Sequence, residues 1–254
     1  MATGTQITLT QVRMAFGDRP VFRDLSCRFP AGRISVVLGG SGSGKSTILR
    51  MIGGLVVPQD GRIDVAGVDV VHCSDAELYD ARRRIGMLFQ GGALLDSLTV
   101  FDNLALPLRE HTDADEAEVL RTVHERLEAV GLHDVDALLP GQLSGGMTKR
   151  TALARAIVRS PEILLCDEPF SGLDPISARR IEALLVRINR TLGITVVVVS
   201  HDVPSTARMA SHVVLLRGGS AVEGTLDELR ALDEPYIRAF LSEEVAEELP
   251  EVAG

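Results

Sequence analysis

A glycine-rich segment at residues 39–47, with the sequence Gly-Gly-Ser-Gly-Ser-Gly-Lys-Ser-Thr, constrains the fold of this chain more than any other feature. It follows the apolar run Ile34–Leu38, which predicts a buried strand, and it precedes an apolar-faced helix at 48–52. Glycines can turn successive N–H groups inward onto an anion, and the following helix adds its positive N-terminal end. Strand, loop and helix together predict a phosphate-binding loop, whereas a flexible linker would not need this spacing.

We expect all nine loop residues to surround a bound phosphate chain: Gly39, Gly40, Ser41, Gly42, Ser43, Gly44, Lys45, Ser46 and Thr47. The Lys45 ammonium would reach the β- and γ-phosphates, and the Ser46 hydroxyl would ligate Mg²⁺. The loop therefore predicts a nucleoside triphosphate with Mg²⁺ as the bound group.

Two adjacent acids, Asp167 and Glu168, follow the apolar run 163–166. An apolar strand ending there would place Asp167 beside the phosphate loop, where it can hold Mg²⁺ directly or through water. Glu168 could then orient and deprotonate an attacking water. Two acids can also simply end a strand, but the phosphate loop upstream favours the catalytic interpretation.

A second glycine turn, formed by Leu143, Ser144, Gly145 and Gly146, opens a predicted helix at 144–158. A helix N-terminus of this kind is another anion-binding element, yet the chain contains a single phosphate loop. The two motifs indicate half-sites that two copies of the chain would share.

Composition and charge limit the partners. The chain has 254 residues, a formal charge of −9, 4 % aromatic residues and no tryptophan, which argues against a nucleic-acid surface. Three scattered cysteines without CxxC spacing favour neither disulfides nor zinc and suit a reducing cytoplasm. We see neither a signal peptide nor an apolar run long enough to cross a membrane, so work at a membrane would require a partner.

The chain pattern predicts one α/β unit at 5–240 and an acidic tail at 241–254. Antiparallel strands at Ile7–Phe16 and 21–29, joined by a turn at 17–20, lead into the phosphate loop, and a short strand pair follows within 61–70. Further core strands are expected at 162–166, 194–200 and 212–216.

A helical lobe is expected at about 97–159, between the core strands. Within it, residues 113–130 carry Leu120, Val123, Leu127 and Val130 at helical spacing, which predicts an amphipathic helix. The tail beyond residue 240 contains several glutamates and no Lys or Arg, and we expect it to be solvated.

The motifs occur in the order phosphate loop, Gln90, Leu143 to Gly146, Asp167 with Glu168, the run Ser-Gly-Leu-Asp at 171–174, and His201. This order resembles that of the ATP-binding subunit of ABC transporters. The resemblance implies a P-loop NTPase fold of the ABC type, with an antiparallel β lobe and an inserted helical lobe. It also implies a homodimer that sandwiches two ATP molecules head to tail, in which Ser144, Gly145 and Gly146 of one copy touch the γ-phosphate held by the other.

The same resemblance implies roles for single residues. Gln90 would approach Mg²⁺ and the attacking water; taken alone, it could be a polar residue that ends a strand. His201 would contact the γ-phosphate and help to orient the water; taken alone, it could be a capping or otherwise satisfied polar group. Asp174 would communicate across the dimer, or it could cap the helix that begins near Pro175. Phe16 matches the aromatic that stacks on adenine, where tyrosine is more usual.

Met147 stands where most relatives have glutamine, and the sequence from Leu143 to Met147 is similar to that of the Mla and Mce-associated ATPases. The segments 100–112 and 200–204 also resemble that subfamily, which powers phospholipid traffic between bacterial membranes. The expected partners are a membrane permease, an Mce-type lipid-binding protein and an accessory subunit, with the chain on the cytoplasmic face of the inner membrane. The alternatives are the ATPase of another ABC importer or exporter, a soluble ABC mechanoenzyme, and a P-loop kinase.

Overall fold

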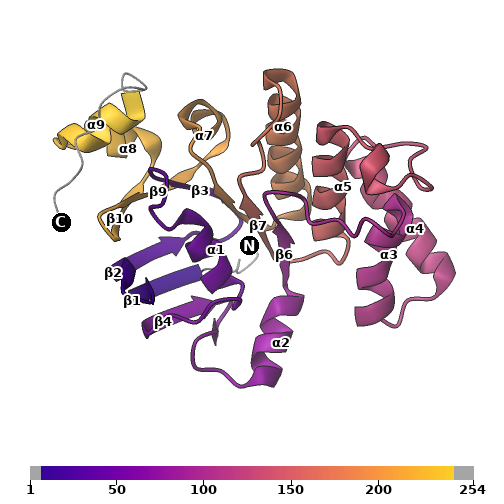
Figure 1. Cartoon of the computed structure of the whole chain (residues 1–254), viewed down its shortest axis with the longest axis horizontal. Helices are drawn as coiled ribbons and strands as arrows, with labels where there is room; N and C mark the ends of the chain where they lie inside the picture. Colours follow the sequence, from indigo (N-terminus) through magenta and orange to yellow (C-terminus); the bar gives the residue numbers. More distant parts are fainter. Residues whose placement is uncertain (1–6, 243–254) are drawn as a thin grey trace.

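The computed structural model describes residues 7–242, whose strands form two sheets. Figure 1 shows the larger sheet crossing the middle of the molecule, with the smaller sheet below it and most helices above and to the right. The larger sheet carries the candidate site at one edge.

The larger sheet is mostly parallel. Its strands, in spatial order, are β10 (Ser220–Gly224), β9 (His212–Arg217), β3 (Ile34–Leu38), β8 (Thr195–Val199), β7 (Ile163–Asp167) and β6 (Ile85–Leu88). Only β10 is antiparallel to its neighbour. Every residue of β3, β7 and β8 is buried, as expected for parallel strands covered on both faces. The carboxyl ends of these strands meet at one edge, which brings the loops that follow them together.

The smaller sheet is antiparallel, in the order β2 (Arg19–Phe29), β1 (Ile7–Phe16), β4 (Asp60–Val65) and β5 (Val68–Asp69). Helix α1 (Lys45–Ile52) contacts β4 on one side and β7 and β8 on the other, so it lies between the two sheets. Its residues Ile48, Leu49, Met51 and Ile52 are buried in a core that both sheets share. The phosphate-loop helix is therefore anchored by two layers of apolar packing.

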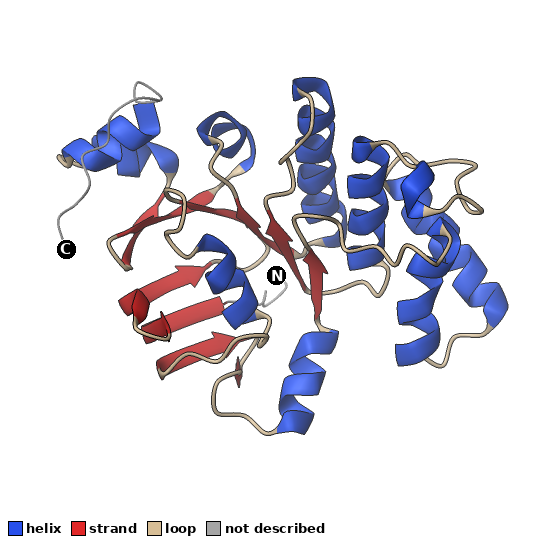
Figure 2. Ribbon diagram, viewed as in Figure 1, coloured by secondary structure: helices blue, strands red, loops and turns tan. Residues whose placement is uncertain are grey.

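The helices on the right of Figure 2 are α3 (Val100–His111), α4 (Glu116–Ala129) and α5 (Gly145–Ile157), followed in the chain by β7 and α6 (Pro175–Leu192). They form one apolar core with the upper face of the larger sheet. α3 to α5 fall within the range 97–159 expected for the helical lobe. The domain limits at 5–240 stay a prediction, and the tail beyond residue 242 lies outside the described residues.

The predicted strands and helices are confirmed, with two corrections. Of the residues predicted for the apolar face of α4, Val123, Leu127 and Val130 are buried, whereas Leu120 is 48 % exposed. The prediction was therefore wrong at this one residue, in whose place Val119 faces inward. The turn predicted at 17–20 is shorter, because β2 already begins at Arg19. Pro20 is tolerated there because β2 is the edge strand of its sheet.

The remaining elements were not predicted: α2 (Asp75–Arg83), α7 (Val203–Met209), β10, α8 (Leu226–Ala231) and α9 (Pro235–Ser242). Each of these helices is short. Within residues 7–242, no helix combines the length and apolar character that a membrane crossing requires.

Candidate active site

The phosphate loop connects β3 to α1 with a backbone that only glycine can follow at two points. Gly44 has φ 95°, and a Cβ there would lie 2.5 Å from the Phe22 ring. Gly39 has φ 154°, and a Cβ there would lie 2.6 Å from Ser43 Oγ. Gly44 is also the N-cap of α1 and offers no side-chain acceptor, so the first N–H groups of this helix depend on another partner. The loop therefore has the form of an anion cradle.

Lys45 lies across this loop. Its Nζ donates to the carbonyl oxygens of Gly39 at 2.8 Å and Gly40 at 3.0 Å. Burial lowers the pKa of Lys45, while the nearby charges of Glu168 and Asp167 oppose that effect. The ammonium is thus held beside the loop and close to both acids.

Ser46 and Asp167 join the loop to the end of β7. The Ser46 hydroxyl donates to Asp167 Oδ1 at 2.8 Å, and Asp167 is buried. A hydroxyl and a carboxylate oxygen at this separation are hard donors of the kind that Mg²⁺ takes. The residues therefore fit a magnesium ion shared with a bound phosphate.

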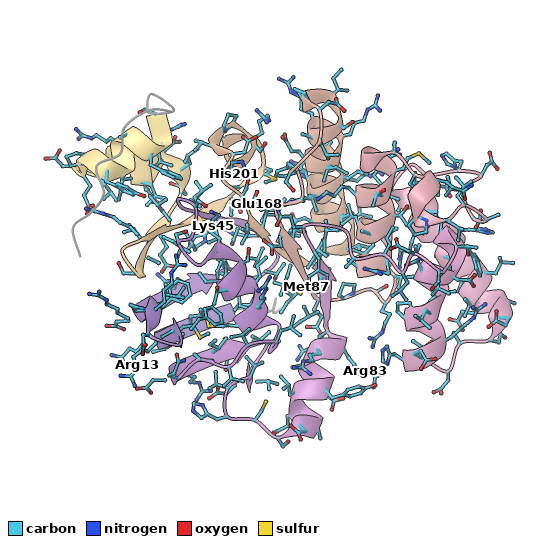
Figure 3. The ribbon with its side chains drawn as sticks, viewed as in Figure 1. Arg13, Lys45, Arg83, Met87, Glu168 and His201 are labelled. Carbon is cyan, nitrogen blue, oxygen red and sulfur yellow. The ribbon has the colours of Figure 1, made fainter. Side chains whose placement is uncertain are left out.

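The Glu168 carboxylate contacts the imidazole ring of His201. His201 Nδ1 lies 3.0 Å from one carboxylate oxygen of Glu168 and 3.1 Å from the other. Glu168 has a left-handed backbone, with φ 46°, and its N–H donates to Val199 O at 3.0 Å. Figure 3 shows Lys45, Glu168 and His201 close together above the sheet. Strain of this kind in a non-glycine residue is typical of functional positions.

A cleft of about 780 Å³ opens over the phosphate loop. Loop residues 41–47 form its floor, and Phe16, Gln90 and Glu168 lie on its walls. Arg19 and Arg23, both on β2, also line it and add positive charge. Neither arginine belongs to a sequence motif, so the sequence did not predict them. The pairing of β2 with β1 places Arg19 opposite Phe16, and Arg23 follows on the same strand.

The second glycine turn lies outside this cleft. Ser144 is the N-cap of α5, and its Oγ accepts a hydrogen bond from Met147 N at 3.3 Å. The side chain of Asp174 caps α6 by accepting from Ile176 N at 2.9 Å and Ser177 N at 3.0 Å, as in the capping alternative. A side-chain hydrogen bond with Ser177, followed by these backbone bonds, lowers the pKa of Asp174.

One chain thus assembles most, though not all, of the predicted site residues. Those brought together around the cleft or joined to it are Phe16, Gln90, Asp167, Glu168, His201 and the loop at 39–47. Those that do not line it are Ser144, Gly145, Gly146 and Asp174.

A parallel sheet with a glycine cradle after one strand, and an acid pair after another, defines a P-loop nucleoside triphosphatase. The family model described as "ABC transporter" matches residues 22–171. The chain belongs to the ABC transporter ATP-binding family and has the ABC ATPase cassette fold. It is accordingly an ATP-binding ATPase.

Two related proteins are similar in sequence to most of this chain. The intermembrane phospholipid transport system ATP-binding protein MlaF of Escherichia coli K12 is 43 % identical over 236 residues, which are 92 % of this chain and 88 % of that protein. The probable ribonucleotide transport ATP-binding protein mkl of Mycobacterium leprae is 41 % identical over 243 residues, 95 % of this chain and 70 % of that protein.

Two solved structures of the bacterial ABC transporter cassette MJ0796 are also similar. Both are dimeric, and one is a post-hydrolysis state bound to ADP and Pi. They match with TM-scores of 0.79 at 32 % and 31 % identity, covering 86 % of this chain and 98 % of theirs.

Proposed function

We propose that this chain is the ATP-hydrolysing subunit of an ABC transporter complex that moves phospholipid between the inner and outer membranes of a bacterium. The observation that carries the proposal is the 43 % identity to the phospholipid-transport protein MlaF across almost the whole chain. The assembled cleft supports the ATPase part of the proposal independently of that relative.

The contacts in the cleft support a division of roles. Lys45 and the loop N–H groups would bind the phosphates, and Ser46 with Asp167 would hold Mg²⁺. When bound, Mg²⁺ would neutralise charge on the β- and γ-phosphates. Glu168 would take the proton of the attacking water, and His201, held to its carboxylate, would orient this group and the γ-phosphate.

Three further residues complete the proposed site. Phe16 is 51 % exposed on the cleft wall, so its ring is free to stack on adenine. Gln90 lines the cleft two residues after the end of β6 and would approach the attacking water and Mg²⁺. Asp174 would act at the dimer surface through its cap on α6.

The cleft is open within one chain, and this favours a homodimer as the hydrolytic form. Ser144, Gly145 and Gly146 would close the cleft of a second copy, and the dimeric MJ0796 cassettes support such an arrangement. ATP would close this dimer and hydrolysis would reopen it, which a partner could convert into alternating access.

We propose a membrane permease as the partner, with an Mce-type lipid-binding protein and an accessory subunit in the same complex. Three exposed apolar residues suit a surface that receives a permease helix: Phe89 and Leu95, which are close to Gln90 in sequence, and Leu106 on α3. The chain would therefore work on the cytoplasmic face of the inner membrane without crossing it.

The test is an affinity pull-down of the full chain from detergent-solubilised native membranes, with mass spectrometry of proteins and lipids. We expect a permease, an Mce-type protein and bound phospholipid. Ribonucleotide with a permease but no phospholipid would favour the activity named for mkl. Recovery of soluble partners alone, from extracts in which other membrane complexes survive, would overturn the transport proposal in favour of a mechanoenzyme.

A further inference from the structure

Lys149 is a buried lysine on α5, five residues after Ser144. It is 7 % exposed, and its Nζ donates to the main-chain carbonyls of Gln90 and Glu168, the latter at 3.4 Å. Both accepting residues belong to the catalytic set. A side chain of the helical lobe is thus bonded directly to the backbone of Gln90 and Glu168, the two residues proposed to act on the attacking water.

The choice of lysine at this position is unusual for this chain. Of its 26 basic residues only Lys45 and Lys149 are lysines, and both lie next to Asp167 and Glu168. Burial lowers the pKa of Lys149, while the charges of Asp167 and then Glu168 raise it. An ammonium is a compact point charge that can bond to converging carbonyls, whereas a guanidinium presents a wide planar fork. The two carbonyl acceptors and the nearby acidic charges suit the ammonium.

The bond to Glu168 acts on a strained backbone. Glu168 has φ 46°, and its carbonyl oxygen accepts from Ser171 N at 3.2 Å, Ser171 Oγ at 3.0 Å and Lys149 Nζ. A left-handed conformation in a residue with a long side chain persists only when its surroundings impose it. Lys149 is one of the groups that hold this carbonyl oxygen, on the same residue as the proposed catalytic carboxylate.

The same helix grips the loop after Gln90 at a second place. Arg155 donates to Gly92 O at 2.9 Å and to Ala93 O at 2.8 Å. A Cβ on Gly92 would already be 3.4 Å from Ala152 and from Thr148, so α5 packs closely along this loop. A shift of α5 would therefore also move the loop that follows Gln90.

We propose that Lys149 is a positioning residue that couples the two ATP sites of the dimer: it transmits the engagement of Ser144 with the nucleotide of the second copy to Glu168 and Gln90 of its own chain. Ser144 and Lys149 are separated by about 7.5 Å along one rigid helix. One end of α5 serves the partner's site, and the Lys149 contacts serve its own. The inference rests on the proposed homodimer with shared ATP sites.

The test compares Lys149→Gln, Lys149→Arg and a control, Arg187→Gln, in the full-length chain within its purified membrane complex. Arg187 is exposed on α6 and also donates to a main-chain carbonyl, that of Ala129, away from the catalytic loops. We expect Lys149→Gln to lower kcat about tenfold, which is ~1.4 kcal/mol of transition-state stabilisation, and to reduce the Hill coefficient for ATP towards 1. Lys149→Arg should recover part of kcat because the charge is kept, and Arg187→Gln should resemble wild type.

A second readout separates positioning from a structural role. In a Glu168→Gln background, Lys149→Gln should still form the ATP-trapped dimer with the affinity of the parent, because Ser144 and the phosphate loop are intact. Unchanged kcat and cooperativity, or a loss of dimer formation in parallel with hydrolysis, would overturn the inference. If the Glu168→Gln parent itself fails to dimerise with ATP, the proposed function fails instead, so the two failures are distinguishable.

Discussion

Two glycine turns precede helices α1 and α5, and the N-termini of these two helices are capped differently. At α1 the N-cap is Gly44, which has no side chain to offer the first helical N–H groups, and Lys45 and Ser46 follow at once. At α5 the N-cap is Ser144, whose own hydroxyl accepts from Met147 N at 3.3 Å. The N-terminus of α1 is therefore free to bind an anion in the chain's own cleft, whereas the N-terminus of α5 is capped by the Ser144 side chain.

The surroundings of the two turns differ in the same sense. Gly39 and Gly44 are required by the fold, since a Cβ at either would collide with neighbouring side chains. A Cβ on Gly145 or Gly146 would meet no heavy atom closer than 3.5 Å. Contacts among residues 7–242 do not explain glycine at 145 and 146, which agrees with the proposed close approach of a group from a second copy.

The largest effect is expected where the cleft does its chemistry. Glu168→Gln keeps the size of the side chain but cannot accept a proton, so hydrolysis should fall by about 10²- to 10⁴-fold while ATP binding is kept. Phosphate release and light scattering would detect lost turnover and a trapped dimer. Glu162→Gln is the control, because Glu162 lies just before the first residue of β7, at the end of the strand away from Glu168, and pairs with Arg84. Rapid turnover by Glu168→Gln in the complex would contradict the role of general base.

The next effect separates the two turns by ATP affinity. Lys45→Ala removes charge-assisted contacts to phosphate worth about 1.5–3 kcal/mol, so affinity should fall roughly 10- to 100-fold. Ser144→Ala should leave the affinity of the isolated monomer unchanged, because Ser144 does not line the cleft. Equal losses in titration calorimetry would mean that both turns act on the same nucleotide within one chain.

A glycine pair sharpens the comparison further. Gly44→Ala forces a side chain into a left-handed position beside Phe22 and should destabilise the fold by about 1–3 kcal/mol. Gly146→Ala lies in a helix with room for a methyl group and should stabilise the fold by up to about 1 kcal/mol, yet it should reduce hydrolysis. Thermal melts and ATPase rates would check both. Full activity of Gly146→Ala would remove the reason for proposing a close contact there.

The smallest effect is expected at Met147. Its N–H makes the bond to Ser144, while its side chain packs against the apolar core of the helical lobe. Met147→Gln should therefore change kcat and ATP affinity by no more than about twofold, or ~0.4 kcal/mol. A large gain in either, measured in the assembled complex, would show that a polar contact is missing at this position.

The sequence predicted the parallel core and most of the cleft because their signals are local. Ile34–Leu38 is uniformly apolar, the loop has a fixed spacing, and Asp167 follows its strand directly. The topological rule for parallel strands then brings Lys45, Asp167 and His201 to one edge without knowledge of side-chain packing.

The rest depends on tertiary contacts that no local pattern encodes. Leu120 and Val119 are equally apolar, and only the positions of α3 and α5 decide that Val119 faces inward. Arg23 lines the cleft from strand β2, and the contacts of Lys149 with two carbonyls exist only in the folded chain. The left-handed backbone of Glu168 is likewise imposed by neighbours distant in sequence.

The most direct measurement mixes two variants, Lys45→Ala and Gly145→Asp, each in a Glu168→Gln background. An aspartate in the first turn of α5 suits the helix but would repel a γ-phosphate. If the turns act between copies, neither variant alone should dimerise with ATP, whereas the mixture should form a dimer that retains one nucleotide, at the site built from the intact loop and the intact turn. A mixture as monomeric as its parents would contradict a shared site.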